Sequence, residues 1–173
     1  APETAELHLA RAFVAAERGA VEEAQVDLQN ARRASSRLHD DLRFRFDIRC
    51  AMIELFVLRD RAALVESAMR GRRLLTRVQS ASWPLDRATL ALMQLCLGRG
   101  EARLLDRPLE ALRLLREARA AAEDLGYTAL KLTAEAESCI PSVAAGDLED
   151  TRRLAEATLG QATSLGWSEL PSI

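Results

Sequence analysis

The stretch that decides the fold of this chain lies at residues 24–38 and reads AQVDLQNARRASSRL. Small or apolar residues recur in it, at steps of four, three, four and three, at Ala24, Leu28, Ala31, Ser35 and Leu38. Residues with this spacing lie on one face of an α-helix. The stretch therefore predicts a helix with one packed face.

The same pattern returns three times along the chain. It is found as LVESAMRGRRLLTRV at 64–78, as ALRLLREARAAAEDL at 111–125 and as TRRLAEATLGQATSL at 151–165. Internal repetition at offsets of 40, 47 and 40 residues is typical of helical repeat proteins. If each copy is the second helix of a pair, the first helices are expected at 3–17, 39–58, 86–104 and 128–144.

These patterns predict an all-α fold. A chain of 173 residues is long enough for one domain that buries a core between stacked helices. We expect a right-handed α-solenoid of four helical hairpins with a period of about 40 residues. A single domain is expected over 1–173, with repeats at 1–38, 39–78, 79–125 and 126–165.

Charge is distributed unevenly along this chain of net charge −2. Residues 31–80 contain 12 basic and six acidic residues, whereas residues 121–173 contain three basic and nine acidic ones. The basic segment could meet an anionic partner. The alternative is a solvated helix surface with pairs such as Glu66 and Arg70, four residues apart.

The three cysteines, Cys50, Cys96 and Cys139, lie far apart inside apolar stretches. This spacing matches neither a zinc site nor a redox motif, so we expect small core residues in a reducing, cytoplasmic compartment. The most apolar stretch, Cys50 to Leu58, is interrupted by Glu54, which argues against a membrane span. We expect no metal and no cofactor.

Candidate catalytic residues are few. His8 and His39 fall near expected helix starts in different repeats, and spacing suggests no partner for either. Carboxylate pairs such as Asp40 and Asp41 fall in first helical turns, where the helix dipole favours negative charge. No enzymatic activity is expected from this pattern.

Nucleic-acid binding is a further alternative. The arginines between Arg32 and Arg77 could neutralise phosphates, with Phe44 and Phe46 available for stacking on bases. Both phenylalanines, however, fall on apolar helical stripes, and acidic residues flank the region on both sides. We do not expect this segment to bind nucleic acid.

The helical pairs resemble tetratricopeptide repeats. In that family the second helix carries small, bulky and small residues at the spacing of Ala24, Leu28 and Ala31. The chain departs from the pattern at Leu64 in the second repeat and at Thr158 in the fourth. The proline that usually follows the second helix is absent from all four repeats.

Repeats of 40 or more residues that close with a Leu-Gly step, such as Leu125-Gly126, look most like the repeat region of MalT-type regulators. These are large ATP-binding bacterial transcriptional regulators of the LuxR family. No glycine-rich loop ending in Gly-Lys-Ser/Thr occurs in this chain, so nucleotide binding is not expected here.

The resemblance implies a non-catalytic sensor region that binds a protein or peptide partner or a small-molecule effector. The inner-face spacing of the family points to Phe13, Phe46, Arg49, Phe56 and Met93, and Arg45 lies one turn before Arg49. An apolar channel with a few arginines would suit an amphipathic peptide or a small anionic ligand. Two alternatives stay open: these residues pack one helix on the next, or the chain is a generic protein-protein scaffold.

The two ends of the chain suggest a piece of a longer protein. The chain opens Ala-Pro-Glu, and the triplet Leu165-Gly166-Trp167 repeats Leu125-Gly126-Tyr127 at an offset of 40. A further helix is expected to follow the second triplet, as it follows the first. Without that helix the last repeat would expose apolar surface, which self-association or a tail folded back through Trp167 and Leu170 would cover.

Overall fold

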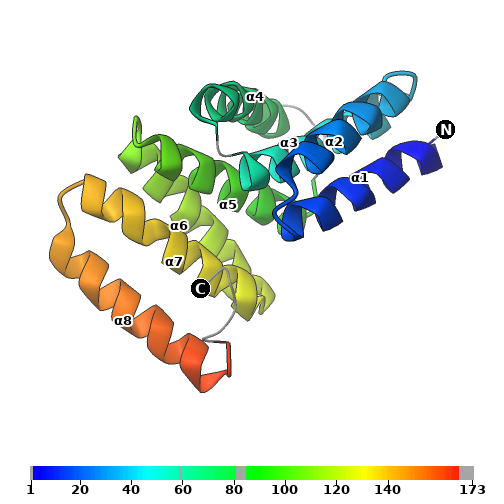
Figure 1. Ribbon diagram of the computed structural model, residues 1–173. Coiled ribbons are helices and arrows are strands. Elements are labelled where there is room, and N and C mark those ends of the chain that lie inside the picture. Colours follow the sequence, from blue (N-terminus) through cyan, green and yellow to red (C-terminus); the bar gives the residue numbers. More distant parts are fainter. Residues whose placement is uncertain (1, 59, 81–84, 168–173) are drawn as a thin grey trace. The chain divides into compact units, whose positions relative to one another are not determined.

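The computed structural model describes residues 2–58, 60–80 and 85–167, and within these residues helices are the only regular secondary structure (Figure 1). Eight helices occur there: α1 (Pro2–Glu17), α2 (Val21–Ser35), α3 (Asp40–Val57), α4 (Arg61–Ser80), α5 (Arg87–Leu104), α6 (Pro108–Leu125), α7 (Thr128–Ala144) and α8 (Leu148–Ser164). The first helices of the four pairs are confirmed to within two residues at each end. Leu170, which was expected in a folded-back tail, lies outside the described residues.

The chain divides into two compact units, residues 1–77 and 78–173. The division falls beside the junction of the second and third expected repeats, where the offset lengthens from 40 to 47 residues. Unit 1 contains α1, α2, α3 and most of α4, and unit 2 contains α5 to α8. The single domain and the solenoid arrangement stay predictions.

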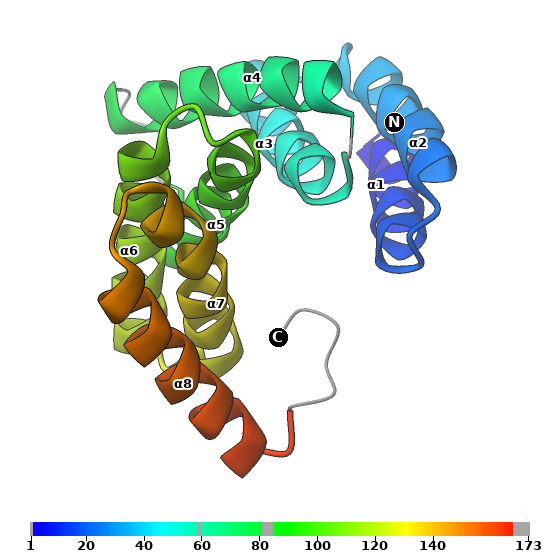
Figure 2. The same cartoon turned by 60° about the vertical axis from the view of Figure 1, so that its left-hand side comes forward.

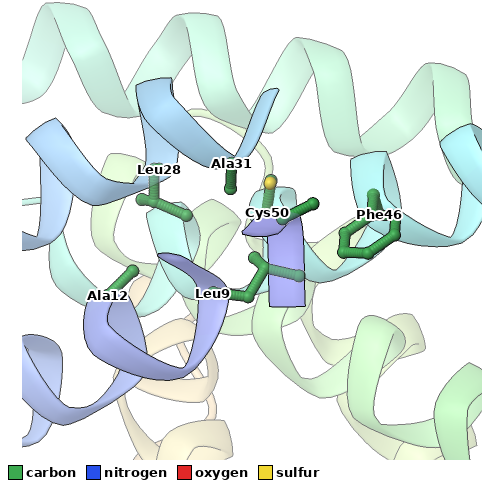
Figure 3. Packing of buried hydrophobic residues seen from close by; sticks show 7 residues of the cluster. Leu9, Ala12, Leu28, Ala31, Phe46 and Cys50 are labelled. Carbon is green, nitrogen blue, oxygen red and sulfur yellow. The ribbon is translucent and has the colours of Figure 1, made fainter. Parts of the chain in front are cut away.

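The core of unit 1 is built where α1, α2 and α3 meet. Its main cluster, shown in Figure 3, consists of Ala5, Leu9, Ala12, Leu28, Ala31, Phe46 and Cys50. A second cluster, formed by the same three helices, consists of Ala15, Ala16, Ala24 and Val57. Alanines at the contact positions let helix backbones approach closely, and leucines fill the space between them.

Unit 2 is assembled by sequential packing of α5, α6, α7 and α8, each against the next (Figure 2). Leu95, Leu115, Ala118 and Ala134 form its hydrophobic cluster. Gly98 of α5 lies against α6, and a Cβ atom there would stand 2.8 Å from Cγ of the buried Leu115. Glycine at this position therefore permits the close approach of the two helices.

The repeated pattern identified the packed face of three of the four second helices. Ala24, Leu28 and Ala31 are buried, as are their counterparts in α4 and α6. In α8 the buried residues are Thr158 and Ala162, whereas Ala155 is exposed. The fourth helix therefore packs through only part of its expected face.

The two Leu-Gly-aromatic triplets have the same backbone geometry. Gly126 and Gly166 take the left-handed conformation, with φ of 73° and 72°. The amides of Tyr127 and Trp167 each donate 2.8 Å hydrogen bonds to carbonyls five residues earlier, those of Ala122 and Ala162. These bonds satisfy helix-terminal carbonyls, as in Schellman ends. The sequence match thus predicted a structural match.

None of the helices in the described part of the chain combines the length and the apolar character needed to cross a membrane.

Candidate binding surface

Four of the sequence-predicted residues lie on adjoining faces of α1 and α3. Arg45, Arg49 and Phe56 are spaced by four and seven residues, so they share one face of α3. Glu6 and Phe13, seven residues apart, share one face of α1. The two faces are joined by Arg49, whose Nη1 atom lies 2.6 and 2.7 Å from the two carboxylate oxygens of Glu6. We call these five residues the α1–α3 face.

Most side chains of the α1–α3 face are open to solvent. Phe13 is 55% exposed, an unusual position for a phenylalanine. Arg45 is also exposed, and within the described residues its side chain has no ion pair or hydrogen bond. Phe56 is half-buried and packs against the second core cluster of unit 1. The face therefore combines an exposed aromatic ring with two arginines, of which one is held by Glu6.

Phe46 and Met93 occupy different surroundings. Phe46 is 4% exposed and belongs to the main core cluster of unit 1, although Cζ of Arg49 lies 5.9 Å from its ring centroid. Met93 is fully buried in α5, in unit 2. For both residues burial favours a packing role, which is the alternative that the sequence left open.

Glu54 is a buried carboxylate at the centre of unit 1, and sequence reasoning assigned it no role. Glu54 is only 9% exposed to solvent. Nη1 of Arg32 from α2 donates to Oε1 of Glu54. Two groups of α4 donate to Oε2: the Ser67 hydroxyl at 3.1 Å and Nη1 of Arg70 at 3.2 Å. A buried carboxylate needs such partners because burial removes its hydration. Glu54 thus fastens α3 to both neighbouring helices.

Glu135 repeats this arrangement in unit 2. It lies on α7, and Nε of Arg119 from α6 donates to its Oε1 at 2.7 Å. The hydroxyl of Thr158 from α8 lies 3.4 Å from its other oxygen. In both units a buried glutamate on one helix is held between an arginine of the preceding helix and a hydroxyl of the following one. We call these two groups the Glu54 clamp and the Glu135 clamp.

His8 has a partner that sequence spacing did not suggest. Nδ1 of His8 lies 2.7 Å from Oδ1 of the buried Asp27, and Nε of Arg11 lies 3.2 Å from Oδ2. Asp27 is the acidic residue on the small-residue face of 24–38, and an acid on a packed face is a signal for a buried partner. The group joins α1 to α2 and has a structural explanation.

The thiols of the chain are poor nucleophiles. Burial raises the pKa of Cys50 and of Cys96 to about 12, and burial also raises the pKa of Cys139. All three are free cysteines and stay protonated at neutral pH. Among the described residues no group of three or more histidine, cysteine and acidic side chains could hold a metal ion.

Comparison with protein-family models, with curated proteins and with solved structures gives no match for this chain.

Proposed function

We propose that the chain is a right-handed solenoid of tetratricopeptide-like hairpins that serves as a non-catalytic binding module. Its role would be effector or partner recognition within a bacterial transcriptional regulator of the MalT type, in the cytoplasm. The observation that carries the binding proposal is the α1–α3 face, where exposed Phe13 lies on the helix face that Glu6 joins to Arg49. The free thiols are compatible with a reducing compartment.

The α1–α3 face suits a ligand that is both apolar and acidic. A leucine-rich surface would cover the rings of Phe13 and Phe56, and a carboxylate would pair with Arg45, which has no ion pair within the described residues. A second carboxylate could replace Glu6 at Arg49, since that pair is exposed to water and contributes little stability. An amphipathic acidic helix has this combination of groups.

Fluorescence anisotropy with a labelled helical peptide, glutamate on one face and leucine on the other, tests the proposed face. Arg45→Glu should weaken binding by about tenfold or more, because an attraction becomes a repulsion and tenfold corresponds to only about 1.4 kcal/mol. Arg18→Glu is the matched control, since Arg18 is also exposed and its side chain has no partner among the described residues. Equal weakening by both variants would show that net charge, and not this face, attracts the peptide.

A thermal-shift screen of the chain against metabolites separates the regulator from its rival, a protein-protein scaffold without an inducer. An effector that binds only the folded state must raise Tm in a concentration-dependent way. A screen in which the peptide raises Tm and no metabolite does would favour the scaffold.

A further inference from the structure

An open cavity whose lining includes three arginines lies at the C-terminal end of α2, and none of the five residues of the α1–α3 face lines it. Its volume is about 840 Å³, and its walls include Arg32, Arg33 and Arg37. Thr4, Ala34, Ser36 and Leu38 complete its lining. None of the residues that line it is acidic. Three like charges around one opening repel each other unless an anion joins them.

Helix capping does not account for these arginines. Basic residues in the last turn of a helix often stabilise its terminal carbonyls. In α2 the carbonyl of Arg32 already accepts from the amide of Ser36 and the hydroxyl of Ser35, at 3.0 and 3.1 Å. The carbonyl of Arg33 accepts from the Ser36 hydroxyl at 2.8 Å. The guanidinium groups are therefore not required as capping donors at these carbonyls.

Ion pairing accounts for one arginine of the three. Arg32 donates through Nη1 to Glu54, but its buried Nη2 has no acceptor within the described residues. Glu54 also receives Arg70, so its single negative charge is shared between two arginines. Arg33 and Arg37 are exposed, and their side chains have no ion pair or hydrogen bond in the part of the chain that the structure describes.

We propose that this cavity binds a small solute that carries phosphate groups. Its arginines offer more than two positive charges. A phosphate monoester carries a charge of −1.5 to −2 and has three acceptor oxygens, whereas a carboxylate carries a single negative charge. The planar guanidinium fork matches phosphate oxygens in pairs. Leu38 offers an apolar wall for the organic part of the solute. The site is separate from the α1–α3 face and goes beyond the function proposed for it.

Isothermal titration calorimetry of the full 173-residue chain with inorganic pyrophosphate tests the site, at ionic strength held constant with sodium chloride. Arg33→Gln/Arg37→Gln should weaken pyrophosphate binding by about tenfold or more, because two charge-assisted contacts are lost. Both side chains are exposed, so far-ultraviolet circular dichroism should not change. If the double variant nevertheless unfolds, Arg37→Gln alone should weaken binding at least threefold, and unchanged binding by it would contradict the site.

Arg18→Gln/Arg107→Gln is the matched control for charge, since both arginines are exposed and lack side-chain partners among the described residues. It should change pyrophosphate binding by less than twofold. Equal losses in the two double variants, or no binding by the unchanged chain, would overturn the proposal. Succinate is the control for ligand class, and succinate binding as tight as that of pyrophosphate would overturn the assignment to phosphate.

Discussion

The Glu54 clamp of unit 1 and the Glu135 clamp of unit 2 follow one plan but differ in strength. Glu54 is held by two arginines, whose side chains are 28% and 33% exposed, and by a serine hydroxyl at 3.1 Å. Glu135 is held by one arginine, 46% exposed, and by a threonine hydroxyl at 3.4 Å. Coulomb attraction is stronger where water is excluded. We therefore expect α4 to be held more firmly than α8.

The burial of α4 and of α8 follows the same order as the expected strength of their clamps. α4 buries Leu64, Ser67, Ala68, Gly71 and Leu75, whereas α8 buries only Thr158 and Ala162. On α8 the side chains of Leu148 and Leu159 are exposed, as is that of Leu165 directly after the helix. Local stability follows the number of buried apolar contacts. We infer that α8 is the helix of unit 2 that opens most easily.

Breaking the Glu54 clamp should give the largest effect. Glu54→Gln keeps the shape of the side chain but leaves Arg32 and Arg70 without their shared counter-charge. Loss of a buried partner costs 3–5 kcal/mol, and the partial exposure of both arginines lowers the expected loss to about 2–3 kcal/mol. Hydrogen exchange of α2, α3 and α4 measures this loss. Faster alkylation of Cys50, one turn before Glu54, should accompany it.

Glu66→Gln is the control for this change. Glu66 also pairs with Arg70, at 3.4 Å, but its side chain is largely exposed. An exposed pair contributes about 0–1 kcal/mol. Equal effects of the two substitutions would show that burial does not strengthen the Glu54 clamp, and the comparison of the units would lose its basis.

Closing the space at Gly98 should give the next largest effect, in the tightly packed part of unit 2. In Gly98→Ala the new Cβ atom would stand 2.8 and 3.0 Å from Cγ and Cδ2 of Leu115, which is fully buried. Overpacking costs about 1–3 kcal/mol, and the helix propensity of alanine returns up to about 1 kcal/mol. We expect a net loss of stability of about 1–2 kcal/mol, which hydrogen exchange of α5 and α6 would measure. A gain would mean that α5 and α6 can separate without loss.

Breaking the Glu135 clamp should matter less than breaking the Glu54 clamp. In Glu135→Gln the half-exposed Arg119 can turn to water, so the loss is expected at about 1 kcal/mol. Faster exchange should be confined to α6, α7 and α8. A loss as large as that of Glu54→Gln would contradict the order of the two clamps.

The helices were predictable from sequence because each has its own apolar period and its own end signals. The spacing of Ala24, Leu28 and Ala31 describes a contact within one face, and all three residues are buried. The end at Gly126 was predictable because the left-handed conformation there favours glycine. Such signals are local, so they need no knowledge of distant partners.

The clamps were not predictable because their partners are distant in sequence. Glu54 meets Arg32 across 22 residues and Arg70 across 16, on different helices. The available signal was one acidic residue inside the apolar stretch from Cys50 to Leu58. That signal argued against a membrane span, but it did not show which side chains would pair with Glu54.

The residues predicted for an inner face do not share one environment, for a geometric reason. Adjacent helical residues point about 100° apart. Arg45 is therefore exposed while Phe46 is in the core. Family spacing selects positions along a helix, but it does not separate a residue that is open to solvent from one that packs against a neighbouring helix. Phe13 and Met93 illustrate the two outcomes, exposed and buried.

The smallest expected effect is a gain in stability, and it concerns α8, the last helix of unit 2. Gly160 lies inside α8, and a Cβ atom added there would meet no atom within 4 Å. Gly160→Ala should therefore stabilise α8 by about 0.5–1 kcal/mol, because alanine loses less backbone entropy in a helix. Slower hydrogen exchange in α8 would measure the gain, and Ala155→Gly, at an exposed position of the same helix, should reverse it. If Gly160→Ala destabilises α8 instead, another surface packs against this glycine. A loss that grows with protein concentration would identify that surface as a second copy of the chain.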